Sequence, residues 1–146
     1  MPLQFRNLTV TPNDPVHDWG FEGLLAAVDR GDLGDWRRVI EAVRQEPWGP
    51  VVQQLAQVFE VAADSGVCSA IHQAVASIQR ESEQGEKAEV AAQVRKYAVR
   101  SGLSQRDFAR RIGTSASRFS TYANGSVTPS AALMVRMRDA SRSAEG

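Results

Sequence analysis

The sequence predicts an all-α protein made of two parts that carry opposite charge. Apolar residues recur at intervals of three and four from residue 21 onward, which is the spacing of one helix face, and no segment alternates as a half-buried strand would. Residues 95–146 contain ten basic and three acidic residues, a net charge of +7, whereas residues 1–94 contain seven basic and fourteen acidic residues, a net charge of −7. The zero net charge of the chain therefore conceals two regions that should have different partners.

The composition is that of a globular protein. A chain of 146 residues allows one ordinary domain or two small ones, and 42% hydrophobic and 23% charged residues can form a packed core. Cys68 is the single cysteine, so no disulfide can form within the chain. The N-terminal segment lacks a basic start followed by an apolar run, and no stretch reaches the ~18 apolar residues of a membrane helix. We expect a soluble, cytoplasmic protein without membrane contact.

The N-terminal part should be irregular over residues 1–18 and helical afterwards. Pro2, Pro12 and Pro15 disfavour helix in the first segment. Gly31, the segment 46–50 and the vicinity of Gly66 should end successive helices. The apolar sets that predict four helices are Phe21, Leu24, Leu25 and Val28; Leu33, Trp36, Val39, Ile40 and Val43; Val52, Leu55, Val58, Phe59 and Ala62; and Val67, Ile71, Ala74, Val75 and Ile78.

Residues 79–87 contain no apolar side chain and cannot anchor to a core. They form either a solvated helix or a hinge at Gly85. We place the domain boundary there: an acidic helical domain at 1–80, a polar linker or solvated helix at 81–87, and a second domain at 88–146. Helical spacing resumes at Val90, Val94, Tyr97 and Ala98 and should end at Ser101-Gly102.

Residues 103–133 contain start and stop signals for short helices. Ser104 can cap the first helix, with Asp107 three residues later in a capping-box-like arrangement. Gly113 permits a tight turn, and Ser115 can cap the next helix.

The end of this segment completes the pattern. Asn124-Gly125 is a helix stop, and Pro129-Ser130 introduces a last helix. The predicted inward-facing residues are Phe108, Ala109, Ile112, Phe119, Tyr122, Leu133, Met134 and Met137. The outward face of the middle helix is then small or polar with one arginine, which suits a helix that enters a major groove, because short side chains let the backbone approach base edges.

This segment resembles the lambda-repressor-like (Cro/CI-type, XRE) helix-turn-helix family over roughly residues 88–140. The matching residues are Leu103-Ser104-Gln105, Phe108-Ala109, Ile112-Gly113, Ser115, Phe119, Tyr122, Gly125, Pro129-Ser130 and Leu133. The resemblance implies a DNA-binding domain whose recognition helix, about residues 115–123, lies in the major groove.

The same resemblance assigns roles to individual residues. Gln105 matches a position that typically holds a phosphate or a neighbouring base contact. Ala116, Ser117, Ser120 and Thr121 match positions that contact base edges, and Arg118 and Asn124 match positions that contact the DNA backbone. Ser115 lies at the start of the recognition helix. Ala116 and Ala123 depart from the common pattern, and Ala116 can offer only a thymine-methyl contact.

We therefore predict a sequence-specific transcriptional regulator, such as a repressor, that binds double-stranded DNA as a homodimer. Because residues 1–80 are acidic, they should dimerise, bind a protein partner or sense a small ligand instead of lying on DNA. The alternative is an antitoxin-type protein whose N-terminal half binds a partner protein while the helix-turn-helix autoregulates transcription. All three tryptophans lie in this half. We expect them to be buried in the helical core; the alternative is that one of them is exposed in an interface.

Catalysis finds no support in the sequence. His17 and His72 lie far apart without metal-ligand spacing, Cys68 has no neighbouring nucleophile pattern, and the aspartates at 14, 18, 29, 32 and 35 are expected in turns and caps. We expect Cys68 to be buried and inert. No enzymatic activity, cofactor or metal is predicted.

Overall fold

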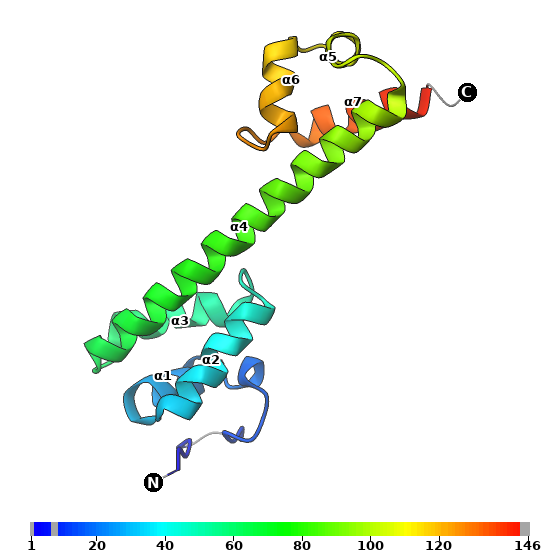
Figure 1. Cartoon of the computed structure of the whole chain (residues 1–146). Coiled ribbons are helices and arrows are strands. Elements are labelled where there is room, and N and C mark those ends of the chain that lie inside the picture. Colours follow the sequence, from blue (N-terminus) through cyan, green and yellow to red (C-terminus); the bar gives the residue numbers. More distant parts are fainter. Residues whose placement is uncertain (1, 7–8, 144–146) are drawn as a thin grey trace. The chain divides into compact units, whose positions relative to one another are not determined.

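A computed structural model describes residues 2–6 and 9–143 (Figure 1). The first domain was expected to begin at residue 1 and the second to end at residue 146, and both of these boundaries lie outside the described residues. Every regular element in the described ranges is a helix, which confirms the all-α prediction. The chain forms two compact units, Met1–Ser82 and Glu83–Gly146. The elements are η1 (Val16–Asp18), α1 (Gly20–Arg30), α2 (Leu33–Gln45), α3 (Pro50–Val61), α4 (Ser65–Ser101), α5 (Gln105–Ile112), α6 (Ala116–Ala123) and α7 (Ala131–Ser143).

The first unit packs η1, α1, α2, α3 and the beginning of α4 around one apolar core. Asp32 caps α2 through a reciprocal capping box, in which the Asp35 backbone N–H donates to Asp32 at 3.1 Å and the Asp35 carboxylate accepts from the Asp32 backbone at 2.9 Å. The core residues are Val16, Trp19, Leu24, Ala27, Val28, Val39, Val43, Val51, Leu55, Val58, Ile71, Val75 and Ile78.

The three tryptophans have different environments. Trp19 is buried, and its indole N–H donates to the Asp14 carbonyl at 2.9 Å. Trp36 is half-buried and donates to the Ala27 carbonyl at 2.8 Å. Trp48 is 49% exposed in the turn between α2 and α3, so the expectation of a core aromatic is wrong for this residue.

Helix α3 ends earlier and α4 begins earlier than the apolar spacing predicted. The Asp29 carboxylate accepts hydrogen bonds from the backbone of Ala63 and Asp64 and stabilises the turn after Val61. The Asp64 carboxylate then accepts from the Val67 backbone N–H at 3.0 Å, as an N-terminal cap does. The distant Asp29 contacts and the local Asp64 cap, and not Gly66, set the boundary.

Helix α4 continues without interruption through residues 79–87, so this polar segment is helical. Gly85 is exposed, and a Cβ at this position would meet no atom within 4 Å. Residues 65–82 of α4 belong to the first unit and residues 83–101 to the second.

The second unit consists of the end of α4 together with α5, α6 and α7 (Figure 1). Its core confirms every inward-facing residue predicted for the three short helices, with Met134 partly buried at the edge. Val94 and Ala98 of α4 complete this core from the other side. The core fixes which faces of α5 and α6 remain exposed.

Candidate nucleic-acid interface

The turn between α5 and α6 is built from local signals that the sequence displays. Gly113 has φ 85°, in the left-handed region that glycine adopts without strain. The Thr114 backbone N–H donates to the Ala109 carbonyl at 2.9 Å, which closes the end of α5. Ser115 then caps α6, because its hydroxyl accepts from the Arg118 backbone N–H at 3.1 Å.

Ser104 caps α5 in the same manner and accepts from the Asp107 backbone N–H at 3.1 Å. The structure gives only this half of the expected capping box, without a bond from the Ser104 backbone to the Asp107 carboxylate. The fully reciprocal box occurs instead at Asp32 and Asp35.

The two helices are held together by an apolar contact that fixes the rotation of α6. Phe108 and Phe119 meet edge to face with ring centroids 5.6 Å apart, and both rings are fully buried. Ala109 is also fully buried, as expected for a small residue where two helices cross. Since Phe119 and Tyr122 point inward, the opposite face of α6 is turned to solvent.

The predicted DNA-binding residues divide into two groups by position. Seven lie on α6 or at its ends; of these, Thr121 is half-buried, and the exposed ones are Ser115, Ala116, Ser117, Arg118, Ser120 and Asn124. Gln105 lies apart from them as the exposed first residue of α5, in a small groove that Arg95, Phe119 and Ala123 also line.

Four residues of the α6 group, Ser115, Ser117, Arg118 and Thr121, line one open hollow together with Tyr122 and Val127. Val127 was not predicted as part of this face, because it lies in a loop where apolar periodicity carries no information. Its position became apparent only from the return of the loop toward α6.

Hydrogen bonds within the unit decide which polar groups remain available. The Thr121 hydroxyl donates to the Arg118 carbonyl at 2.6 Å, so its proton is already used. The Asn124 side-chain oxygen accepts from the backbone and hydroxyl of Ser126 at 2.9 and 2.6 Å. Within the described ranges, no hydrogen-bond or ion-pair partner is found for the side chains of Ser120 and Arg118.

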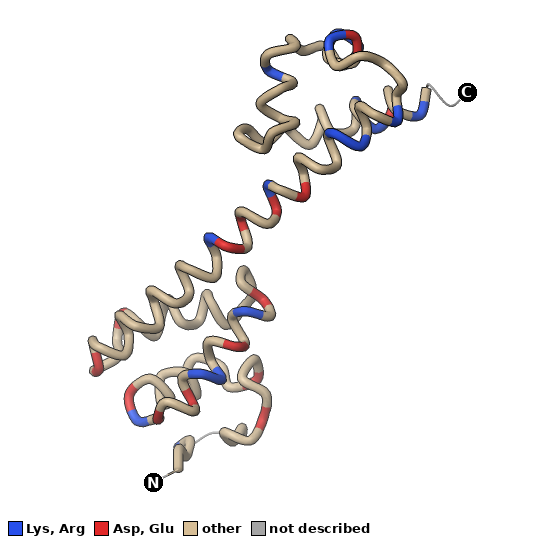
Figure 2. The backbone as a smooth tube through the Cα atoms, in the orientation of Figure 1, with Lys and Arg blue, Asp and Glu red and all other residues tan. Residues whose placement is uncertain are grey.

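Figure 2 marks the basic residues along the backbone of this unit, and the hydrogen bonds of their side chains differ. Arg106, Arg110 and Arg111 are exposed on α5. Arg95 donates to the carbonyl of Ala123 and so fastens α4 to the end of α6. The arginines of α5 are therefore exposed to solvent, whereas Arg95 is engaged within the unit, although all of them contribute equally to the net charge.

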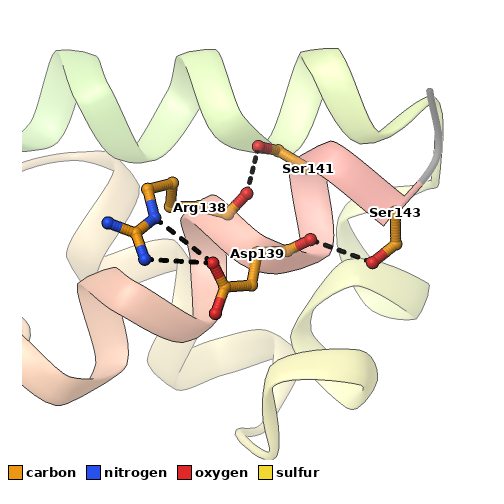
Figure 3. Close-up of polar contacts among 4 residues, drawn as sticks. All are labelled: Arg138, Asp139, Ser141 and Ser143. Carbon is orange, nitrogen blue, oxygen red and sulfur yellow. Dashed lines mark hydrogen bonds and ion pairs between the residues drawn. The ribbon is translucent and has the colours of Figure 1, made fainter. Parts of the chain in front are cut away.

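Arg138 on α7 is paired with the next residue in the chain (Figure 3). It is half-buried, and its guanidinium contacts the Asp139 carboxylate at 3.2 Å through both Nε and Nη2. The hydroxyls of Ser141 and Ser143 donate to carbonyls of the same helix, at 2.6 and 2.9 Å. The polar side chains of this part of α7 are therefore bonded within the helix, and the Arg138 guanidinium has a partner that the Arg118 guanidinium lacks within the described ranges.

The described part of the chain also bears on the expectations for metal ligands, the cysteine and membrane helices. It contains no group of three or more His, Cys, Asp or Glu side chains that could hold a metal ion. Cys68 is half-buried, not buried as expected, and burial together with Asp29 and Asp64 raises the pKa of its thiol. None of the described helices combines the length and apolar character needed to cross a bilayer.

Comparison with known proteins supports this description of the second unit. Residues 89–143 match the family model of a helix-turn-helix domain. Searches among curated proteins and among solved structures returned no match. The C-terminal part of the chain is thus a helix-turn-helix domain, in which α5 and α6 form the two helices of the motif and the lambda-repressor-like type stays a prediction.

Proposed function

We propose that the protein is a sequence-specific regulator of transcription that inserts α6 into the major groove of double-stranded DNA. The observation that carries this proposal is the composition of the exposed face of α6. It presents short side chains and one unpaired arginine, while the aromatic residues of the same helix are buried. Short hydroxyl side chains allow a helix to approach base edges closely, and an unpaired guanidinium can bind a phosphate or a guanine.

Within this proposal the residues of the interface have distinct tasks. Arg118, Asn124 and Gln105 position the domain on the sugar–phosphate backbone, to which the exposed arginines of α5 add positive charge. Ser117 and Ser120 read base edges by hydrogen bonding. Because the Thr121 proton is engaged with the Arg118 carbonyl, Thr121 can offer DNA only its methyl group and an acceptor lone pair.

The protein would act as a homodimer on a two-fold operator. One arginine and a few hydroxyls per recognition helix provide modest affinity alone. Two half-sites about one DNA turn apart, ~34 Å, would combine the contributions of two subunits. The lambda-repressor-like type and the repressor role belong to this same proposal.

Selection of bound duplexes from a random pool, with the purified full-length protein at low ionic strength, tests the proposed function. We expect an enriched site with two inverted half-sites. Recovery of no enriched sequence, with binding equal for all duplexes, would contradict sequence-specific recognition. Absence of binding to any duplex would contradict DNA binding itself.

A second function is favoured by the surface of the acidic unit. Leu33, Trp48 and Val61 are large apolar residues that are 56%, 49% and 61% exposed. Exposed tryptophans often anchor protein interfaces. We propose as the alternative an antitoxin-type role, in which this unit binds a partner protein and DNA binding autoregulates the pair. A stoichiometric partner that co-purifies with the wild type but not with Trp48→Ala would support it, and a stable homodimer without any partner would count against it.

A further inference from the structure

The loop after α6 folds back along this helix and brings an aliphatic side chain to the recognition face. The Val127 backbone N–H donates to the Thr121 carbonyl at 3.1 Å, and the Ser126 hydroxyl oxygen lies 3.3 Å from the same carbonyl. Gly125, with φ 83°, allows the chain to reverse at this point. Val127 is therefore held beside the last turn of α6 instead of extending into solvent.

Val127 is 47% exposed and lines the open hollow on the recognition face. Thr121, which lines the same hollow, has its hydroxyl proton engaged within α6, so its contribution toward a ligand is mostly apolar. Ser115, Ser117 and Arg118 line the same hollow. The hollow thus combines aliphatic side chains with polar and positively charged ones.

This combination selects among the groups that DNA presents in the major groove. The only apolar group on the base edges there is the C5-methyl group of thymine. A positively charged side chain such as Arg118 complements the phosphates that flank every base. A partner protein that bound only through aliphatic side chains would gain nothing from an arginine in the same hollow.

We propose that Val127, together with Thr121, contacts the C5-methyl group of one thymine in each half-site. Val127 is then a specificity-determining residue outside the recognition helix. This inference rests on the proposed DNA-binding function and adds to it the identity of one recognised base. It differs from the methyl contact expected of Ala116, which lies at the other end of α6.

Replacement of each thymine of the selected operator by deoxyuridine, one position at a time, provides the test, because this change removes only the methyl group. At one thymine per half-site we expect the wild type to bind about fourfold more weakly to uracil, the factor for losing one buried methyl group. Val127→Ala should discriminate thymine from uracil less than about twofold at that position, because only the methyl group of Thr121 remains beside the base. A thymine read by Ala116 should keep its discrimination in the same variant.

Val135→Ala provides a matched control, because Val135 is 46% exposed on α7 and has the same side chain. It should discriminate thymine from uracil as the wild type does. If Val127→Ala retains every preference for thymine, or if the wild type binds the operator tightly and shows none, the inference is wrong while the proposed function stands. Failure of the wild type to bind any duplex overturns both. Thermal unfolding of both valine variants checks that neither loses its fold.

Discussion

At the scale of single residues, Arg118 differs from Arg138 of the same helix-turn-helix domain by its surroundings. It is exposed on α6, and within the described ranges its guanidinium has no protein partner. Arg138, in contrast, is paired with Asp139 at 3.2 Å. A guanidinium without a carboxylate can neutralise a phosphate, whereas a paired one must first lose its partner.

Arg118→Ala should therefore weaken binding to specific and non-specific DNA alike. The slope of log affinity against log salt should become less steep by about one for each bound subunit, because one phosphate contact is lost. Fluorescence anisotropy titrations at several salt concentrations measure this slope. Arg138→Ala serves as the control and should leave the slope nearly unchanged. Equal slopes for the wild type and Arg118→Ala would remove Arg118 from the interface.

Asp32 provides a prediction about pH at the same scale. The backbone N–H of Asp35 donates to its carboxylate and holds the pKa of Asp32 below the ordinary value of 3.8. A carboxyl group whose pKa is lowered by folding stabilises the folded state above its unfolded pKa, and this contribution disappears as the pH falls through the folded pKa.

The first unit should accordingly lose part of its stability on acidification through Asp32. Urea unfolding from about pH 7 to about pH 3 should show a smaller acid-induced loss for Asp32→Asn than for the wild type, because asparagine also caps helices but does not titrate. Glu41→Gln removes an exposed carboxylate of the same helix and should not flatten the profile. Parallel profiles for the wild type and Asp32→Asn would refute this account of the cap.

At the scale of the elements, the caps of α5 and α6 were predictable because their signals are local. A serine before each helix and a glycine between the helices act through backbone geometry within four residues. The bond between the Thr121 hydroxyl and the Arg118 carbonyl also lies within one turn, but serine and threonine side chains have several such options, so the sequence does not choose among them.

Other features of the elements could not be predicted for different reasons. Residues 79–87 carry no apolar side chain, so periodicity cannot distinguish a solvated helix from a hinge. The end of α3 depends on Asp29, a residue more than thirty positions earlier in the chain. Val127 belongs to the recognition face only because its loop turns back onto α6.

The cap of α6 allows stability and DNA binding to be separated at one position. Ser115→Ala should lower the free energy of unfolding of the helix-turn-helix domain by about 1 kcal/mol, because the Arg118 backbone N–H loses its acceptor. Ser115→Asp should preserve stability, since aspartate caps well and suits the helix dipole. It should nevertheless weaken DNA binding, because it adds a negative charge beside the phosphates. Urea unfolding and anisotropy titrations measure the two effects, and unchanged affinity for Ser115→Asp would place this helix end away from DNA.

At the scale of the whole molecule, an acidic unit and a basic helix-turn-helix domain follow one another in the chain, and helix α4 contributes residues 65–82 to the first and 83–101 to the second. Gly85 lies in this helix, exposed and without neighbours near its missing Cβ. Glycine in a helix interior destabilises by about 0.5–1 kcal/mol relative to alanine.

Gly85→Ala should therefore raise the free energy of unfolding by roughly that amount, ~0.5–1 kcal/mol, as urea unfolding followed by circular dichroism would show. Gly113→Ala should have the opposite sign and lower it by about 1–2 kcal/mol, because Gly113 has φ 85° and alanine is strained there. Destabilisation by Gly85→Ala would indicate a non-helical backbone at this position and favour the hinge.

The central claim is that the outward face of α6 lies against DNA, and a single added charge tests it most directly. Ser120 is exposed on this face and has no side-chain hydrogen bond within the described ranges, so Ser120→Glu should leave the fold intact. Gln93→Glu adds the same charge at an exposed position of α4. In anisotropy titrations of the selected operator, Ser120→Glu should lose detectable binding while Gln93→Glu binds nearly as the wild type does. Wild-type affinity for a correctly folded Ser120→Glu variant would contradict the account.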